Sequence, residues 1–225
     1  MNSPSLLVPS SPRGLWIALL GPDGAGKSAV VSQLQQQLEP AFARVSQFHF
    51  RPMFGKSASG RTPVTHPHAQ RPRSSLISLF KLIYWLLDYW YGYLFVVAPR
   101  LRRSELVVFD RYFLDTLVDP RRYRLPIRVL GVADWICGLA PRPDLCILLD
   151  APSHVVLRRK REVSPGETRR QRLAYLTMFE SLPRSVIVDA ERPIADVAQQ
   201  ITAAVLSRAI NLSSHEPDAE LIANL

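Results

Sequence analysis

A glycine-rich stretch near the start of the chain carries the residues whose types and spacing best support chemistry. Residues 21–28 follow the pattern G-x-x-x-x-G-K-S, between an apolar run, 15–20, and a segment with helical composition, 29–38. This is the sequence context of a phosphate-binding P-loop, in which backbone N–H groups and a helix N-terminus face an anion. We therefore expect the loop to bind a nucleoside triphosphate. The predicted nucleotide-binding residues are Gly21, Pro22, Asp23, Gly24, Ala25, Gly26, Lys27 and Ser28.

Four further roles follow from residue type. Lys27 supplies a mobile cation for the β- and γ-phosphates, and the Ser28 hydroxyl is suited to bind Mg²⁺. Asp110 ends an apolar run and could be the carboxylate that orients Mg²⁺ or its waters, or it could instead cap a helix. Arg111 and Arg51 also end predicted strands, where a guanidinium could hold acceptor phosphate oxygens.

A strongly basic stretch, 158–172, is interpreted as a helical lid. Such a flap would add positive charge and exclude water once donor and acceptor are both bound. The alternative is a solvated helix face. The dipeptide Pro165-Gly166 suggests a break or hinge within it. The basic residues of the stretch are Arg158, Arg159, Lys160, Arg161, Arg169, Arg170 and Arg172.

Short apolar runs alternate with helical segments along the chain. This alternation predicts an α/β fold, with a parallel sheet covered by helices on both faces and a ligand site beyond the carboxyl ends of the strands. Asp150 and Asp189 also end strands, and we interpret both as structural turns or caps. The expected strands are 15–20, 45–50, 105–110, 145–149 and 186–188, and the expected helices are 29–38, 126–140, 153–161, 173–181 and 194–210.

Composition sets the domain organisation. An apolar content of 47% in 225 residues can fill the core of one domain, which we place at 14–210, between flexible tails at 1–13 and 211–225. The net charge of +9 indicates anionic partners. The basic residues do not gather at the termini and are not interleaved with aromatic residues, so we expect no nucleic acid partner.

The cysteines and histidines do not suggest a metal centre. Cys137 and Cys146 lie in apolar surroundings and are expected to be buried thiols in a reduced compartment. His66 and His68 are two residues apart but lack further ligands. The opening of the chain does not resemble a signal peptide, so we expect a cytoplasmic location.

Residues 76–98 form the most apolar stretch of the chain. Its length is near that of a membrane span, but Lys81, Asp88 and Gly92 interrupt it. We interpret it as a helix that packs on the sheet and on a second copy of the chain. Contact with a membrane surface, and a true membrane span, are the alternatives.

Four motifs, in this order, resemble those of the thymidylate kinase family. Gly21–Ser28 is similar to G-x-D-G-A-G-K-S, Phe50-Arg51-Pro52 stands in place of R-E-P, and Val108–Tyr112 contains D-R-Y. Leu149-Asp150-Ala151-Pro152 matches L-D-x-P, and Arg159 follows it in the place of the lid arginine. The similarity covers about 14–210.

This resemblance implies a three-layer α/β/α P-loop fold with a five-stranded parallel sheet, a helical lid, and ATP with Mg²⁺. It also implies a homodimer formed through helices. Arg51 and Arg111 would hold the acceptor phosphate, and Asp23 would lie near the acceptor sugar. Lys27, Arg111 and lid arginines such as Arg159 would stabilise the transferring phosphoryl group.

The segment 113–124 departs from the family pattern. Asp115 stands where the family has Ser, and Asp119-Pro120 stands in place of Tyr-Gln, which helps to recognise the acceptor nucleotide. Arg121 and Arg122 add positive charge beside them. We therefore expect Asp115, Arg121 and Arg122 to contact the acceptor, together with Asp23, Arg51 and Arg111.

Three functions are compatible with these features. The first is an ATP-dependent kinase that acts on a nucleoside monophosphate such as dTMP, the family default. The second is a kinase of a sugar or glycan end, as in thymidylate-kinase-like proteins of bacterial surface-polysaccharide pathways, with Asp23 or Asp115 as base for a hydroxyl acceptor. The third is a nucleotide-dependent binding or switch protein.

Overall fold

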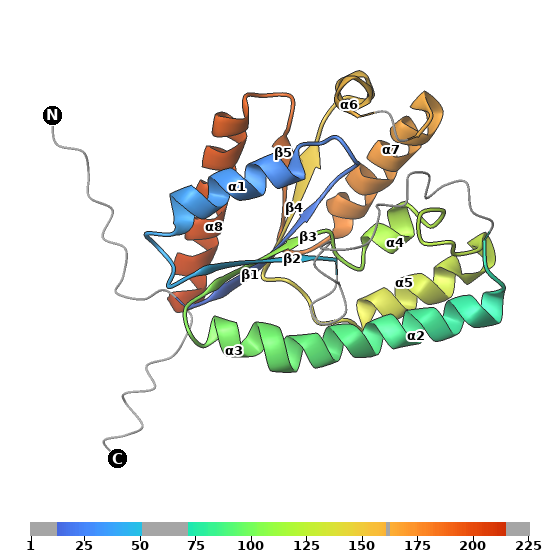
Figure 1. Cartoon of the computed structure of the whole chain (residues 1–225), viewed down its shortest axis with the longest axis horizontal. Helices are drawn as coiled ribbons and strands as arrows, with labels where there is room; N and C mark the ends of the chain where they lie inside the picture. The colour runs from blue at the N-terminus through green and yellow to red at the C-terminus, as the bar shows by residue number, and fades with distance from the viewer. Residues whose placement is uncertain (1–12, 51–71, 161–162, 215–225) are drawn as a thin grey trace, which may run out of the picture.

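One parallel five-stranded sheet in the order β2-β3-β1-β4-β5 forms the centre of the molecule (Figure 1). The computed structural model describes residues 13–50, 72–160 and 163–214. Helices cover both faces of the sheet, which confirms the predicted three-layer α/β/α fold. The strands are β1 Leu15–Leu20, β2 Val45–His49, β3 Leu106–Asp110, β4 Leu145–Asp150 and β5 Ser185–Asp189.

The central strand β1 is buried on both faces, so it is apolar at every position rather than alternating. Its odd-numbered residues enter one core and its even-numbered residues enter the other, because successive strand side chains point to opposite faces. The first core contains Leu15, Ile17 and Leu19, and the second contains Trp16, Ala18 and Leu20.

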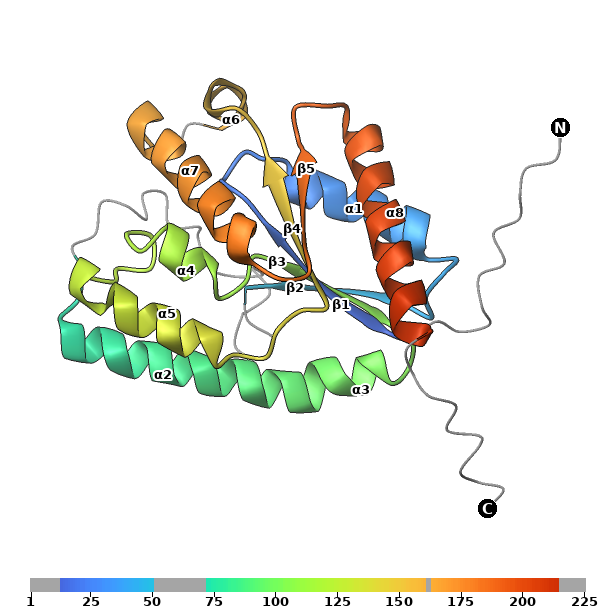
Figure 2. The same ribbon diagram turned by 180° about the vertical axis from the view of Figure 1, so that it is seen from behind.

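The helices divide between these two cores. Helices α1 (Lys27–Leu38) and α8 (Ile194–Ser213) pack on the first. Helices α2 (Ser75–Gly92), α5 (Leu130–Gly138) and α7 (Pro165–Ser181) cover the second, as both views show (Figure 2). The shorter elements are the π-helix η2 (Tyr93–Val97), α3 (Ala98–Leu101), α4 (Asp115–Val118), the 3₁₀-helix η3 (Ile127–Val129) and α6 (Ser153–Arg159).

The helical region is interrupted near Pro165-Gly166, as predicted, but the interruption lies before this dipeptide, between α6 and α7. Pro165 is the first residue of α7, whereas the helix was predicted to begin at Leu173. The Ser164 hydroxyl accepts a hydrogen bond from the Glu167 N–H at 3.3 Å, which caps the helix. Proline is favoured at this first position, where its missing N–H has no partner to lose, and S-x-x-E is a capping-box sequence.

Other boundaries moved by a few residues. Strand β2 ends before Phe50, whose φ of 61° is incompatible with continued extended chain. Helix α8 continues through Ser213, into the predicted C-terminal tail. The predicted helix 126–140 divides into η3 and α5.

The apolar stretch 76–98 lies within α2, η2 and the start of α3, which follow one another without a break. Among the described residues, no helix is long and apolar enough to cross a membrane.

We expect Gly14→Ala to destabilise the protein. A Cβ at Gly14 would lie 2.4 Å from the carbonyl oxygen of Leu101 and 2.5 Å from its Cα, which are backbone atoms that cannot rotate away. Such overpacking should lower the free energy of unfolding by about 1–3 kcal/mol in a urea titration. The matched control is Gly131→Ala in α5, where a Cβ meets nothing within 4 Å and helix propensity predicts a gain of up to about 1 kcal/mol. Equal effects of the two substitutions would contradict the prediction.

Candidate active site

The P-loop connects β1 to α1 through a turn that requires glycine. Gly21 and Gly24 have φ of 139° and 94°, and Gly26, with φ of 96°, precedes the first residue of α1. A Cβ at Gly21 would lie 2.8 Å from the Leu149 carbonyl oxygen, so β4 also restricts this position. The loop therefore opens toward the N-terminus of α1, an arrangement that favours anions.

Lys27 is buried at the start of α1. Its ammonium donates hydrogen bonds to the carbonyl oxygens of Gly21 at 2.8 Å and Pro22 at 3.0 Å. Burial lowers the pKa of Lys27, and the carboxylates of Asp110 and Asp115 oppose part of this shift. The loop thus holds a largely desolvated ammonium between its own carbonyl groups and nearby acids.

Asp110 is the last residue of β3, paired in register with Leu19 of β1 and His49 of β2. One of its oxygens, Oδ2, lies 3.8 Å from His49 Nδ1. The other, Oδ1, is buried and has no hydrogen-bond partner among the described residues. A buried carboxylate oxygen without a donor is costly, and it is suited to a cation or to water held by one.

Arg111 and Arg122 share one carboxylate. The guanidinium of each pairs with Asp23, through Oδ1 for Arg111 and Oδ2 for Arg122. Arg111 has a φ of 75°, and its N–H donates to the Leu19 carbonyl oxygen at 3.0 Å, which ties the residue to the end of β1. The P-loop acid therefore links the ends of β1 and β3 to the segment after α4.

A second acid lies on the other side of Arg111. Asp115 is fully buried, and its Oδ2 lies 3.6 Å from Arg111 Nη1. Its Oδ1 accepts a hydrogen bond of 2.6 Å from the Tyr175 hydroxyl. Burial raises the pKa of Asp115, whereas Arg111 and the Tyr175 hydrogen bond act in the opposite direction. The pKa of Tyr175 is raised by its burial and by Asp115, which keeps the phenol protonated as a donor.

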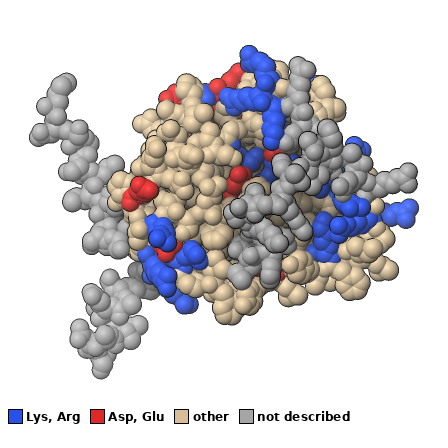
Figure 3. Space-filling view, in the orientation of Figure 1, with Lys and Arg blue, Asp and Glu red and all other residues tan. Residues whose placement is uncertain are grey.

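Lys27, Asp110 and Arg111 line a cleft of about 440 Å³ at the carboxyl edge of the sheet. In Figure 3, acidic and basic atoms lie next to one another near the centre of the view. Further basic atoms lie above them, in the region where Figure 1 shows α6. Arg159, at the end of α6, donates to the Ala190 carbonyl oxygen at 3.0 Å. The cleft is lined by Asp23, Gly24, Gly26, Lys27, Ser28, Ala29, His49, Asp110, Arg111, Arg122, Arg159 and Lys160.

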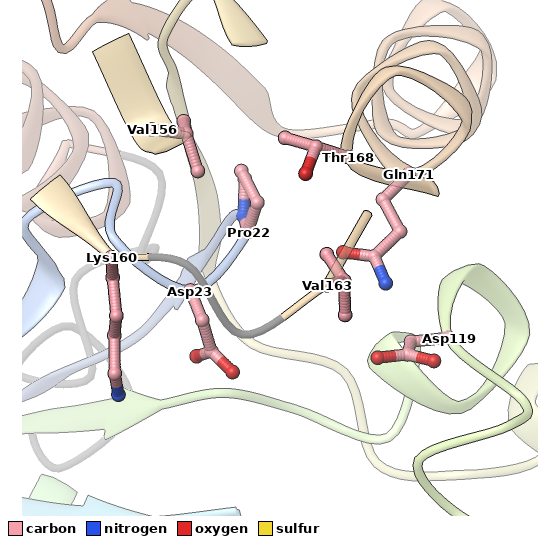
Figure 4. A pocket seen from close by; sticks show the side chains of 8 residues that line it. All are labelled: Pro22, Asp23, Asp119, Val156, Lys160, Val163, Thr168 and Gln171. Carbon is pink, nitrogen blue, oxygen red and sulfur yellow. The ribbon is translucent and has the colours of Figure 1, made fainter. Parts of the chain in front are cut away.

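Helix α7 and the end of α6 lie next to the P-loop. Thr168 and Gln171 point from α7 toward a gap that Pro22, Asp23 and Lys160 also line (Figure 4). The gap holds about 10 Å³, close to the size of one water.

Two of the lid arginines are occupied by contacts within the protein. Arg170 pairs with Glu167 and donates to the Val118 carbonyl oxygen at 2.8 Å. Arg172 makes two hydrogen bonds, of 2.7 and 2.8 Å, to Asp150. The positive charge of α7 thus fastens the helix to α4 and β4. Asp150, predicted to form a turn or a cap, instead ends β4 and pairs with Arg172.

The structure brings most of the predicted site residues together, in one cleft. Three predicted acceptor residues differ from the rest. Asp115 is buried behind Arg111 rather than open to the cleft, and Arg121 is exposed and does not line it. Arg51 lies outside the described residues, as do His66 and His68. The free thiols Cys137 and Cys146 are buried, as expected.

Sequence reasoning did not select Tyr175, His49 or Lys160 individually. Tyr175 lies 60 positions from its partner Asp115, and no local spacing pattern connects them. His49 could have been found as the last residue of a strand beside Asp110. Among the described residues, no group of three or more His, Cys, Asp or Glu side chains could hold a metal ion alone.

Comparison with known proteins is consistent with this geometry. A family model described as thymidylate kinase matches residues 20–201. A thymidylate kinase of Xanthomonas campestris is 29% identical to this chain, and the alignment covers 96% of this chain and 94% of the relative. A thymidylate kinase of Leifsonia xyli is 30% identical, and the alignment covers 86% of this chain and 95% of the relative. The solved structure of a Candida albicans thymidylate kinase has a TM-score of 0.63 at 18% identity, covering 87% of this chain and 92% of its own, and supports the fold.

The two arginines Arg159 and Arg172 should differ in their effect on ATP binding. Arg159 lines the cleft, whereas Arg172 is held by Asp150. We expect Arg159→Ala to weaken ATP binding about tenfold or more in calorimetric titration, the effect of a lost hydrogen bond to a charged group. Arg172→Gln should leave the affinity within about twofold. Equal losses in both variants would mean that Arg172 leaves Asp150 to bind nucleotide.

Proposed function

The chain belongs to the thymidylate kinase family, and we propose that it transfers the γ-phosphate of ATP to dTMP. Family membership makes it a phosphotransferase of the P-loop kinase type. The observation that carries the assignment is the shared cleft of Lys27, Asp110 and Arg111. It combines the P-loop of a donor site with an arginine suited to an acceptor phosphate.

On the donor side, the glycine loop 21–26 would hold the ATP phosphates through its N–H groups. Lys27 would move from its loop carbonyls to the β- and γ-phosphates and stabilise charge as the phosphoryl group transfers. Arg159 and Lys160 would add positive charge from the end of α6.

The site fits Mg²⁺. Asp110 offers a buried Oδ1 without a donor among the described residues, and the exposed Ser28 hydroxyl lines the same cleft. Few protein ligands are needed, because Mg²⁺ keeps several waters and binds substrate phosphates as well. Bound there, the ion would neutralise charge on the β- and γ-phosphates.

On the acceptor side, Arg111 and Arg122 would hold the acceptor phosphate in fork geometry. Both now pair with Asp23, so acceptor binding would share or replace that contact. Asp23 would then be free to meet the acceptor sugar. Arg51 and Arg121 are proposed as further acceptor contacts on the strength of the sequence motifs alone.

We expect dTMP to stimulate ADP release from ATP and Mg²⁺ in a coupled assay with the full chain. Lys27→Ala should reduce this rate at least about 100-fold, since one preorganised charge contact with the transition state is lost. Other nucleoside monophosphates and sugars form the comparison panel. Stimulation by a sugar but not by dTMP would overturn the acceptor assignment. ATP binding without stimulation by any acceptor would favour a switch protein.

We further propose that the chain forms a homodimer through an apolar strip on α2 and η2. The strip is exposed, from 41% for Ile83 to 72% for Phe80. In both ribbon views α2 runs along the edge of the molecule, opposite the sheet (Figures 1 and 2). Spacings of three and four residues are typical of a helix that pairs with another helix. The residues at these spacings are Leu76, Phe80, Ile83, Leu87, Trp90 and Leu94.

Sedimentation velocity tests this interface. Phe80→Glu and Leu87→Glu should each convert a dimer to a monomer, because a charge would be buried in an apolar seam. Ile210→Glu on α8, at a position 48% exposed, is the matched control and should leave the dimer intact. A monomeric wild type that floats with lipid vesicles, and loses flotation in Phe80→Glu, would show that the strip contacts a membrane surface instead.

A further inference from the structure

Asp115 is an ionisable side chain in an unusual place. It has no exposed surface, although its carboxylate belongs to a segment that borders the active site. Burial of a carboxylate is costly unless other groups compensate the charge. Its position at the start of the four-residue helix α4 does not require this burial, because an acid in the first helical turn can remain in water. The compensating contacts therefore indicate what the residue does.

The first contact fixes the orientation of Arg111. One nitrogen of its guanidinium, Nη2, pairs with Asp23, and the other, Nη1, faces Asp115 at 3.6 Å. A guanidinium is planar, with its N–H donors in a rigid fork. Acids on both terminal nitrogens therefore restrict rotation of the plane. Of these two acids, only Asp23 would orient Arg111 if Asp115 were removed. Asp23 also pairs with Arg122, so its carboxylate is shared between two guanidinium groups.

The second contact fixes the orientation of Asp115. Its Oδ2 has no hydrogen-bond donor among the described residues, so the 2.6 Å hydrogen bond from Tyr175 to Oδ1 is the main directional restraint on the carboxylate. Tyr175 is itself buried and lies on α7, the helix whose first turns pack on the P-loop. A chain of contacts thus runs from α7 through Asp115 to Arg111.

We propose that Asp115 and Tyr175 are positioning residues: Tyr175 orients Asp115, and Asp115 holds the Arg111 guanidinium in the plane in which it meets the acceptor phosphate. The proposal rests on the role of Arg111 proposed above. It replaces the expectation that Asp115 contacts the acceptor directly. It also makes the placement of the acceptor arginine depend on the position of α7.

Two conservative variants separate the two contacts. Asp115→Asn removes the charge but keeps an oxygen that can accept from Tyr175, and Tyr175→Phe removes only the hydroxyl. We expect each to raise the KM for dTMP, Asp115→Asn by about tenfold and Tyr175→Phe by several-fold, with the KM for ATP within about twofold. A variant with both changes should match Asp115→Asn within about twofold, because Tyr175 acts through Asp115.

Ser185→Ala is the matched control for loss of a hydroxyl contact with the same helix. Its hydroxyl donates to the carbonyl oxygens of Phe179 and Leu182 at the far end of α7. This variant should leave both KM values unchanged. Thermal melting of every variant reports whether the fold is retained. If Asp115→Asn does not fold, Tyr175→Phe alone tests the positioning proposal, because it removes only a hydroxyl group.

Arg111→Ala tests the proposed role of Arg111 separately from the positioning role of Asp115 and Tyr175. An unchanged KM for dTMP in Arg111→Ala would refute the proposed role of Arg111. A raised KM in Arg111→Ala, with unchanged values in folded Asp115→Asn and Tyr175→Phe, would overturn the positioning proposal alone. Additive effects in the double variant would refute the order in which Tyr175 acts through Asp115. If another member of the panel is the acceptor, the same comparison is made with that compound.

Discussion

Charge burial at the carboxyl edge of the sheet is the constraint on which the site depends. Lys27, Asp110, Arg111 and Asp115 are all buried there, and an isolated charge in such a place would cost several kcal/mol. The two cations are compensated by neighbours: carbonyl oxygens accept from the lysine, and two acids flank the arginine. Removing one group leaves its partner uncompensated, so the arrangement of the others is closely specified.

Parallel topology places these charges together. β1 is apolar throughout, β3 is apolar up to Asp110, and the two strands pair in register. The P-loop that follows β1 and the acid that ends β3 therefore reach the same edge of the sheet. Contacts of α7 with neighbouring elements then restrain its position. Arg170 and Arg172 contact α4 and β4, so these two basic residues attach α7 to the rest of the fold. Arg159 and Lys160, which line the cleft, lie at the C-terminal end of α6.

The fold and the donor half of the site could be predicted from the sequence because their signals are local. The P-loop is one contiguous pattern, and buried strands are continuous apolar runs. The start of α7 was missed because Pro165-Gly166 was interpreted as a break, although Ser164 precedes Pro165 and its hydroxyl caps the helix. The contact between Asp115 and Tyr175 could not be predicted, since it depends on how α4 and α7 pack rather than on spacing.

The departures of 113–124 from the family pattern separate in the structure into two kinds. Asp115 points inward, where it meets Tyr175 and Arg111, so the acid that stands in place of serine lies beside the arginine proposed to hold the acceptor phosphate. Arg122 lines the cleft, and its pair with Asp23 places a second guanidinium beside the first. Neither change removes positive charge from the cleft, where the guanidinium groups of Arg111 and Arg122 both pair with Asp23. Both are therefore compatible with a phosphate-bearing acceptor, and neither by itself selects the base or sugar that carries the phosphate.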